Sequence, residues 1–291
     1  MIAFFGTSQY SVQTLDILAS KNIKPGLIIT TPDKKVGRGL KLTPPPVKIW
    51  AEENNVPFLQ PENLKDEQFL KTLRAGNFDV FIVIAYGKII PQEVIDIPRR
   101  GALNIHASIL PKYRGASPIE SQILADEHNI GVTVMQIDAE MDHGSIVAQQ
   151  YYRPTTAWRK WPMKAEELGH GLVKLGSQLL VEILSDWLED KIEAKPQDHT
   201  QATYTKKITK EDGLIDLSDE AYKNYLKIKA FSNWPGTYFF IEKNGPGRSG
   251  KKIRVIIKKA RYENGVLYIE RVVPEGKKEM DYAEFKRVYL V

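Results

Sequence analysis

The stretch Leu103-Asn104-Ile105-His106-Ala107-Ser108-Ile109-Leu110-Pro111 decides how the rest of the chain is interpreted. It begins as a short apolar run typical of a buried strand and then passes into a loop rich in Gly, Pro and Ser. Residues two positions apart in a strand share one face, so Asn104 and His106 can point at the same ligand. Because side chains at the carboxyl end of such strands commonly line the ligand crevice of open α/β sheets, the stretch predicts a functional site. The alternative is that Asn104 and His106 only form hydrogen bonds within the protein at a polar strand end.

Similar apolar runs occur through the first two thirds of the chain, at Leu27–Thr30, Val80–Ile84, Ala102–Ile105 and Gly131–Met135. They alternate with helical patterns. Near-continuous apolar runs are typical of strands that are buried on both faces, with the intervening helices as crossovers. We therefore predict a Rossmann-like parallel α/β domain over residues 1–190.

A second polar segment, Glu140–Gly144, follows the apolar run Gly131–Asp138. If this run and the one that ends at His106 are neighbouring strands, Asp142 lies in a loop near the same end of the sheet. An amide, an imidazole and a carboxylate then converge, from Asn104, His106 and Asp142. Such a set can stabilise an oxyanion and move a proton, as acyl transfer requires.

The last third of the chain has a different pattern. Residues 191–207 form a predicted linker with little apolar periodicity, and a helix is expected around Asp219–Lys229. Short alternating strands follow, including Lys252–Lys258 and Gly265–Glu270. Several short strands separated by turn residues predict a small barrel at residues 208–291.

Composition agrees with an ordinary two-domain enzyme of 291 residues, 42% of them hydrophobic and 26% charged. Cysteine is absent, which excludes disulfides, a thiol nucleophile and Cys-based metal sites. No metal-ligand spacing such as His-Glu-x-x-His occurs, so we expect a metal-independent protein. No run reaches the length of a membrane span, and Met1 leads directly into a predicted strand without a targeting segment.

Positive charge is concentrated in the smaller domain. Residues 206–291 carry 19 Lys and Arg against 12 Asp and Glu, whereas the whole chain has a net charge of +5. Residues 1–205 therefore carry a net charge of −2. A basic domain with Tyr, Phe and Trp suits RNA, because cations neutralise phosphates and aromatic rings stack on unpaired bases. A solvated Lys-rich surface explains the charge equally well.

Several motifs resemble those of one enzyme family in order and spacing. Around the predicted site they are Asn104–His106, Ser108–Gly115 and Met141–Gly144, and elsewhere they are Phe4–Thr7, Thr31–Gly39, Ile84–Pro91, Ala202–Lys207 and Phe231–Gly236. The chain thus resembles the folate-dependent formyltransferases, and within them the branch that acts on methionyl-tRNA. The resemblance runs from the first strand to about residue 260, and it implies an OB-like fold for the predicted barrel.

The resemblance implies formyl transfer from 10-formyltetrahydrofolate, a cosubstrate, to the α-amino group of methionyl-initiator tRNA. His106 is expected to stabilise the developing oxyanion or to shuttle the proton, and Asn104 to donate its amide to the same oxygen. Asp142 is expected to orient or charge His106 and to help accept the amine's proton. The residues leave the division of labour between His106 and Asp142 open.

The resemblance also implies two sets of binding residues. The predicted folate-binding residues are Ile84, Tyr86, Gly87, Ile89, Pro91, Ser108, Ile109, Leu110 and Pro111. The predicted tRNA-binding residues are Lys34, Lys35, Arg38 and Lys41 in a glycine-containing loop, together with Arg114, Lys206, Lys207, Lys258 and Lys259. We expect a cytoplasmic monomer with no membrane partner.

Two other functions remain open, formylation of an amino sugar on a nucleotide and RNA binding without catalysis on the same scaffold. The basic C-terminal domain, the Phe231–Pro235 motif and the Gly37-Arg38-Gly39 loop favour tRNA over the sugar. The complete set of Asn104, His106 and Asp142 argues against a silent protein. The chain departs from the family pattern at Ala107, where Gly is usual, and at Trp158–Pro162. The two tryptophans of that segment contact RNA or pack on the domain surface, and we favour packing.

Overall fold

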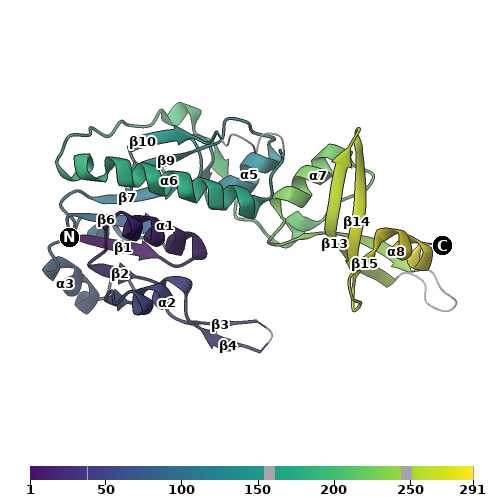
Figure 1. Cartoon of the computed structure of the whole chain (residues 1–291), viewed down its shortest axis with the longest axis horizontal. Coiled ribbons are helices and arrows are strands. Elements are labelled where there is room, and N and C mark those ends of the chain that lie inside the picture. Colours follow the sequence, from purple (N-terminus) through teal and green to yellow (C-terminus); the bar gives the residue numbers. More distant parts are fainter. Residues whose placement is uncertain (38, 154–160, 244–250, 291) are drawn as a thin grey trace. The chain divides into compact units, whose positions relative to one another are not determined.

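The computed structural model describes residues 1–37, 39–153, 161–243 and 251–290 (Figure 1). The chain divides into two compact units. The first is built from residues 1–115, 129–153 and 169–204, and the second from residues 116–128 and the described parts of 154–168 and 205–291. Residues 116–128, which we assigned to the first domain, thus belong to the second unit.

The first unit contains one sheet of seven strands. Their order is β10 (Ile146–Tyr151), β9 (Gly131–Gln136), β7 (Ala102–His106), β6 (Val80–Ile84), β1 (Ile2–Gly6), β2 (Leu27–Ile29) and β5 (Phe58–Leu59). The five strands from β7 to β5 are parallel, which confirms the Rossmann-like architecture. At one edge of the sheet the strand direction changes, because β9 is antiparallel to β7 and β10 is antiparallel to β9.

The central strands are apolar because helices cover the sheet (Figure 1). All five residues of β6 are buried. Alternate residues of β1 and β6, such as Phe5 and Phe81, pack with Phe69 and Leu73 of α3 (Glu67–Ala75) in one core cluster. The Asp66 side chain begins α3 by accepting a hydrogen bond of 2.9 Å from the Phe69 amide. Such packing fixes β6 and, through it, the neighbouring strand β7.

Further helices of the first unit are α1 (Gln9–Ser20), α2 (Pro46–Glu53), α4 (Gln92–Ile95) and α6 (Ala165–Leu188), whose first residues belong to the second unit. Two short antiparallel pairs complete it, β3 (Lys34–Val36) with β4 (Lys41–Thr43) and β8 (Arg114–Gly115) with β11 (Tyr204–Thr205). A 3-10 turn, η2 (His199–Gln201), precedes β11. Among the described residues, no helix is long and apolar enough to cross a membrane.

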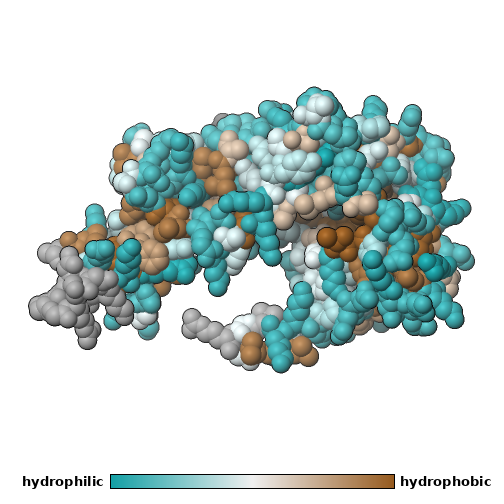
Figure 2. All heavy atoms as spheres, turned by 180° about the vertical axis from the view of Figure 1, so that it is seen from behind, coloured by the Kyte–Doolittle hydropathy of each residue, from teal (hydrophilic) through white to brown (hydrophobic). Residues whose placement is uncertain are grey.

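Most of the predicted glycine-containing loop forms a β-hairpin. The pair β3–β4 extends away from the sheet as an arm (Figures 1 and 2). It exposes Leu40 and Leu42 beside its lysines, so apolar and hydrophilic residues alternate on the arm in Figure 2. Arg38 lies outside the described residues.

The second unit is built on an antiparallel sheet of order β12 (Thr237–Lys243), β13 (Lys251–Glu263), β14 (Val266–Pro274) and β15 (Met280–Asp281). Its helices are α5 (Pro118–Leu124), α7 (Ala221–Ala230) and α8 (Tyr282–Tyr289), and η3 (Glu211–Gly213) is a short 3-10 turn. Helix α7 confirms the helix expected around Asp219–Lys229. Asn264 and Gly265 both have positive φ, at 51° and 80°, and form the tight turn between β13 and β14.

The core of this second unit lies between the sheet and α8. It contains Ile215, Phe239, Val255, Ile257, Val272 and Phe285. An antiparallel sheet domain is thus present where a small barrel was expected. In the described part of the chain, the sheet runs from β12 to β15, and no pairing between those two strands closes it into a barrel.

Candidate active site

His106 is the last residue of β7 and is only 5% exposed. Its Nε2 lies 2.9 Å from the carbonyl oxygen of Tyr113. A carbonyl oxygen can only accept, so Nε2 carries the hydrogen and donates it. The other ring nitrogen, Nδ1, faces Asp142, with 3.6 Å between Nδ1 and Oδ2. The ring is therefore held by a hydrogen bond on one side and presents its second nitrogen to a carboxylate.

Asn104 lies two residues before His106 on β7, so the two side chains share a face of the sheet. The strand is held on both sides, because Asn104 is in register with Val83 of β6 and with Met135 of β9. The Asn104 side chain is partly buried. A carboxamide is thus positioned near the imidazole on a rigid central strand.

The structure brings Asp142 to His106, but by a different route from the expected one. Because β9 is antiparallel to β7, Gln136 at the end of β9 pairs with Leu103 at the start of β7. The chain therefore leaves β9 at the opposite end of β7 from His106. The loop after β9 returns to His106, and Asp142 adopts a positive φ of 53° within it.

Two hydrogen-bond donors hold the returning loop. The amide of Gly115 donates to Oδ2 of Asp142 at 2.7 Å. The Nε2 of Gln197 donates to the carbonyl oxygens of Asp142 and Gly144, at 2.9 and 2.7 Å. The Gly115 amide thus fixes the Asp142 carboxylate, and Gln197 fixes the backbone that carries it. Gln197 was not predicted, because a single Gln in a segment without apolar periodicity carries no recognisable signal.

Arg114 is almost completely buried, at 1% exposure, and its guanidinium group bonds to other side chains inside the protein. Its Nε and Nη2 donate to Oε1 of Gln197 at 3.1 and 2.6 Å, and Nη2 lies 2.8 Å from Nδ1 of His199. The guanidinium therefore holds Gln197, which in turn holds the Asp142 loop. The structure shows no route for the buried Arg114 side chain to reach a large substrate, which disfavours its predicted contact with tRNA.

A buried threonine organises the loop that follows His106. The hydroxyl of Thr133 donates to the carbonyl oxygen of Ser108 at 2.7 Å and accepts from the amide of Leu110 at 3.1 Å. The Ser108 hydroxyl donates to the carbonyl oxygen of Lys112 at 2.6 Å. Ser108 and Leu110 are buried, so these predicted folate-binding side chains hold the loop in shape. Ile109 and Pro111 of the same loop are partly exposed.

The predicted folate-binding segment after β6 divides into buried and exposed positions. Ile84 and Tyr86 lie in the core, and burial raises the pKa of Tyr86 to about 12. The Tyr86 hydroxyl is buried without a hydrogen-bond partner among the described residues. Gly87 has a φ of +80°, which a residue with a Cβ rarely adopts, and Ile89 is 91% exposed. Pro91 begins α4 as its N-cap.

The predicted tRNA-binding lysines lie on several surfaces. Lys34, Lys35 and Lys41 are exposed on the β3–β4 arm. In the other segments, Lys206 pairs with Asp212 at 2.8 Å, and Lys259 pairs with Glu270 at 2.8 Å. Lys207 and Lys258 are exposed.

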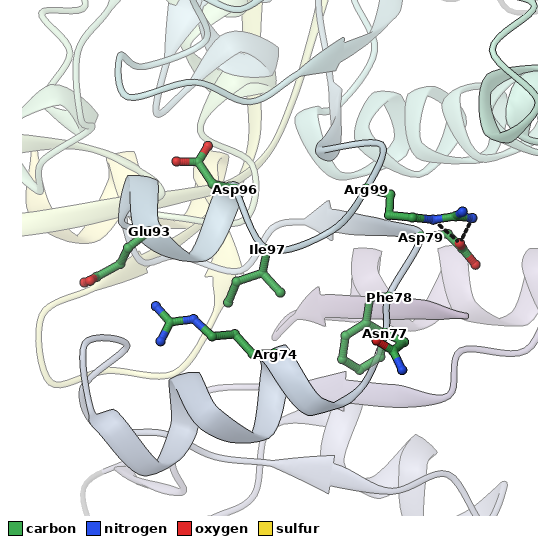
Figure 3. A pocket seen from close by; sticks show the side chains of 8 residues that line it. All are labelled: Arg74, Asn77, Phe78, Asp79, Glu93, Asp96, Ile97 and Arg99. Atoms are coloured by element: carbon green, nitrogen blue, oxygen red, sulfur yellow. Dashed lines mark hydrogen bonds and ion pairs between the residues drawn. The ribbon is translucent and has the colours of Figure 1, made fainter.

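A separate pocket of about 730 Å³ lies at the other end of the parallel strands (Figure 3). It is lined by Arg74, Asn77, Phe78, Asp79, Glu93, Asp96, Ile97 and Arg99. Asp79 directly precedes β6, whereas His106 ends β7. Asp79 accepts hydrogen bonds from the Met1 amine and Arg99, which lower the pKa of its carboxyl. The Asp79 charge in this pocket is therefore paired, and the pocket lies away from His106. We assign it no part in the site.

The arrangement around His106 defines a candidate group-transfer site of the acyl type. A buried imidazole beside a fixed carboxylate can hold a proton, and a neighbouring carboxamide can donate to an oxyanion. Within the described ranges, no cluster of three or more metal-type side chains is present. The fold and the site together define the class as a transferase that passes an acyl group to a nucleophile.

Comparison with known proteins specifies this class further. The formyl transferase family model matches residues 1–160, and the model of the formyl transferase C-terminal domain matches residues 207–264. The methionyl-tRNA formyltransferase of Thermus thermophilus is 36% identical over 99% of this chain and 96% of its own length. That of Chloroflexus aggregans is 43% identical over 82% of this chain and 76% of its own length. The chain belongs to the formyl transferase family.

The fold is also that of a solved N-formyltransferase from Helicobacter canadensis, in complex with folinic acid and dTDP-3-aminofucose. The two structures align with a TM-score of 0.59 over 96% of this chain and 98% of the other, at 17% identity. This likeness concerns the fold alone.

Proposed function

We propose that this enzyme transfers the formyl group of 10-formyltetrahydrofolate to the α-amino group of methionyl-initiator tRNA, for the initiation of translation. The observation that carries the proposal is the buried His106, with its Nδ1 3.6 Å from an Asp142 carboxylate that the Gly115 amide fixes. The relatives at 36% and 43% identity are named methionyl-tRNA formyltransferases. We further propose a cytoplasmic monomer with no membrane partner.

The reaction forms a bond between the amine nitrogen and the formyl carbon and breaks the bond from that carbon to the folate nitrogen. One proton must leave the amine, and one must reach the folate nitrogen. Because Nε2 of His106 already donates to Tyr113, the free position is Nδ1, beside Asp142. We assign the proton to the His106–Asp142 pair and the oxyanion to the amide of Asn104.

The segment after β6 and the loop after β7 fit a folate. Ile89 is an apolar side chain with almost its whole surface exposed, and a planar ring that covers it gains hydrophobic contact. Gly87 lets the main chain come close to a ligand, because it has no Cβ. We propose that Gly87, Ile89, Ile109 and Pro111 contact the donor directly. The core residues Ile84, Tyr86, Ser108 and Leu110, with Pro91, shape this wall.

Two features favour tRNA over an amino-sugar nucleotide as the acceptor. The methionyl-tRNA formyltransferase of Thermus thermophilus matches 99% of this chain, and therefore also its second unit. Residues 206–291 also carry an excess of seven positive charges, which suits a polyanion. The test is a direct comparison of the two acceptors with the same formyl donor. A protein that binds RNA without catalysis is disfavoured by the fixed His106–Asp142 geometry.

Lysines of the second unit provide one prediction. Reversal of Lys258 and Lys259 to Glu should weaken tRNA binding and flatten its salt dependence, because each phosphate contact contributes a slope of roughly 0.7–0.9. Lys259 already pairs with Glu270, so the larger share should come from Lys258. Binding is measured as the tRNA Kd over a range of salt concentrations. The reversed pair Lys65→Glu and Lys71→Glu, on exposed positions of the first unit, is the control.

An unchanged salt slope in the Lys258 and Lys259 variant would show that these lysines are only solvated. The KM for the formyl donor should stay at its wild-type value in both variants. A change in that KM would indicate a wider disturbance than lost phosphate contacts.

Gln197 provides a second prediction. In Gln197→Leu, the loop carbonyls of Asp142 and Gly144 lose their donor and Arg114 loses its acceptor. A buried donor without a partner costs about 1–3 kcal/mol, so both the melting temperature and kcat should fall. Gln197→Glu, which keeps the acceptor for Arg114, should recover part of the stability but not kcat. Gln201→Leu, at an exposed position, is the control, and wild-type kcat in Gln197→Leu would refute the positioning role.

A further inference from the structure

A pocket of about 390 Å³ lies in the second unit and contains none of the proposed catalytic residues. Its volume lies in the range of small-molecule sites, roughly 300–1,000 Å³. It is lined by Trp161, Pro162, Met163, Glu167, Tyr222, Tyr225, Lys229 and Tyr262. Four of these eight side chains are aromatic and partly exposed, so the pocket offers ring faces to a ligand.

One face of α7 supplies three of the lining residues. Tyr222, Tyr225 and Lys229 are spaced by three and four positions, so they lie in a row along the helix. Tyr262 of β13 packs against the two tyrosines, with its ring centroid 5.1 Å from Tyr222 and 5.7 Å from Tyr225. The Tyr225 and Tyr262 rings are nearly parallel, at 24°. The Nζ of Lys229 lies 5.0 Å from the Tyr225 ring centroid.

Asp126 fixes two of the rings. It accepts a hydrogen bond of 2.9 Å from the Tyr222 hydroxyl and one of 2.7 Å from Nε1 of Trp161. These donors compensate the carboxylate charge. Burial and the hydrogen bond to Asp126 raise the pKa of Tyr222 to about 12, so its hydroxyl stays neutral. The rings are thus held in place before any ligand binds, which lowers the entropy cost of binding. Trp161 is thus tied to Asp126 of its own unit, and Trp158 lies outside the described residues.

We propose that this pocket receives one unpaired base of the tRNA substrate, stacked on the Tyr225 and Tyr262 rings. The inference rests on the proposed function and adds a contact site for the same substrate. Aromatic faces bind bases of any sequence, and the Lys229 ammonium suits the attached phosphate. The exposed Glu167 at the pocket is an acceptor for an amino group on the base edge.

The charges favour a nucleotide over a cationic peptide side chain. An aromatic cage by itself would suit an ammonium or guanidinium group. Lys229 offsets the charge of Glu167 in this pocket, however, so the lining offers a cation no net attraction. The excess of seven positive charges over residues 206–291 attracts a polyanion to the same unit. A peptide ligand is therefore an outcome that would contradict the proposal.

The first experiment compares Tyr225→Ala and Tyr262→Ala with Tyr225→Phe and Tyr262→Phe. Loss of a stacked base should raise the tRNA Kd by roughly tenfold in each Ala variant. The Phe variants keep the rings and should bind like the wild type, as should the control Tyr268→Ala. Tyr268 is a matched control because it pairs with Arg261 on the same hairpin, so it lies on the other face from Tyr262. Values of kcat at saturating tRNA and the donor KM should not change.

The second experiment needs no variant. Methionyl-tRNA containing 4-thiouridine or 6-thioguanosine is bound to the wild-type enzyme and irradiated, and the crosslinked peptides are identified by mass spectrometry. Crosslinks within residues 221–230 or 258–263 are expected. Crosslinks confined to other segments, or an unchanged Kd in folded Ala variants, would overturn the proposal. An enzyme that formylates no tRNA would instead refute the proposed function, so the two failures are distinguishable.

Discussion

Replacement of His106 by Ala is expected to lower kcat for formyl transfer to methionyl-tRNA by at least about a hundredfold, the usual contribution of a general acid–base group. The ring is buried and held by the Tyr113 carbonyl, and its Nδ1 faces Asp142. The variant removes the group to which we assign the proton that passes between the amine and the folate nitrogen. Initial rates at saturating donor and tRNA measure kcat, and a binding assay measures the tRNA Kd.

The Kd for tRNA should stay near its wild-type value, because a buried ring contributes little to a polyanion surface. His170→Ala is the control, since His170 is exposed and bonds to Gln13 on α1. A loss of tRNA affinity as large as the loss of kcat would contradict the catalytic assignment. It would mean that His106 supports the shape of the protein instead.

Replacement of Asp142 by Ala is the second large effect, also expected to be about a hundredfold or more in kcat. Its Oδ2 is 3.6 Å from Nδ1 of His106 and accepts the Gly115 amide. Without the carboxylate, Nδ1 of the imidazole loses the group that faces it. Asp142→Asn keeps the shape and should be nearly as slow. Asp138→Asn, in the same loop, is the control, because Asp138 bonds to His143 at 2.7 Å and not to His106.

A double-variant cycle separates a pair that acts as a unit from two independent groups. If His106 and Asp142 hold one proton together, the double Ala variant should be scarcely slower than either single variant. Multiplicative losses would show that the two residues act on different steps. The cycle thus decides the division of labour that the sequence left open.

The sequence predicted the strands and the position of His106 because these depend on local patterns. The apolar runs at Val80–Ile84 and Ala102–Ile105 became β6 and β7. All of β6 is buried, and β7 is buried except for the partly buried Asn104 and Ile105. The i, i+2 spacing of Asn104 and His106 places both on one strand face whatever the neighbours are. Helix α7 follows from an equally local signal.

The remaining features depend on contacts between distant segments. The path of the chain to Asp142 depends on the direction of β9, which is antiparallel to β7. The apolar run Gly131–Met135 does not predict this direction, because a parallel strand would show the same pattern. Gln197 and Thr133 hold the site through hydrogen bonds to carbonyl oxygens, which no spacing rule predicts. Arg114 was predicted to bind tRNA, but its side chain is buried and bonds to Gln197. The sheet order of the second unit likewise required long-range pairing.

The measurement that tests the central claim most directly is the initial rate of formyl transfer from 10-formyltetrahydrofolate to two acceptors in parallel. One acceptor is methionyl-initiator tRNA, and the other is a panel of amino-sugar nucleotides. The account predicts rapid formylation of the tRNA and none of the sugars, with both reactions absent in His106→Ala. Formylation of a sugar nucleotide alone would contradict the assigned acceptor, and transfer to neither would contradict the assignment of this site as catalytic.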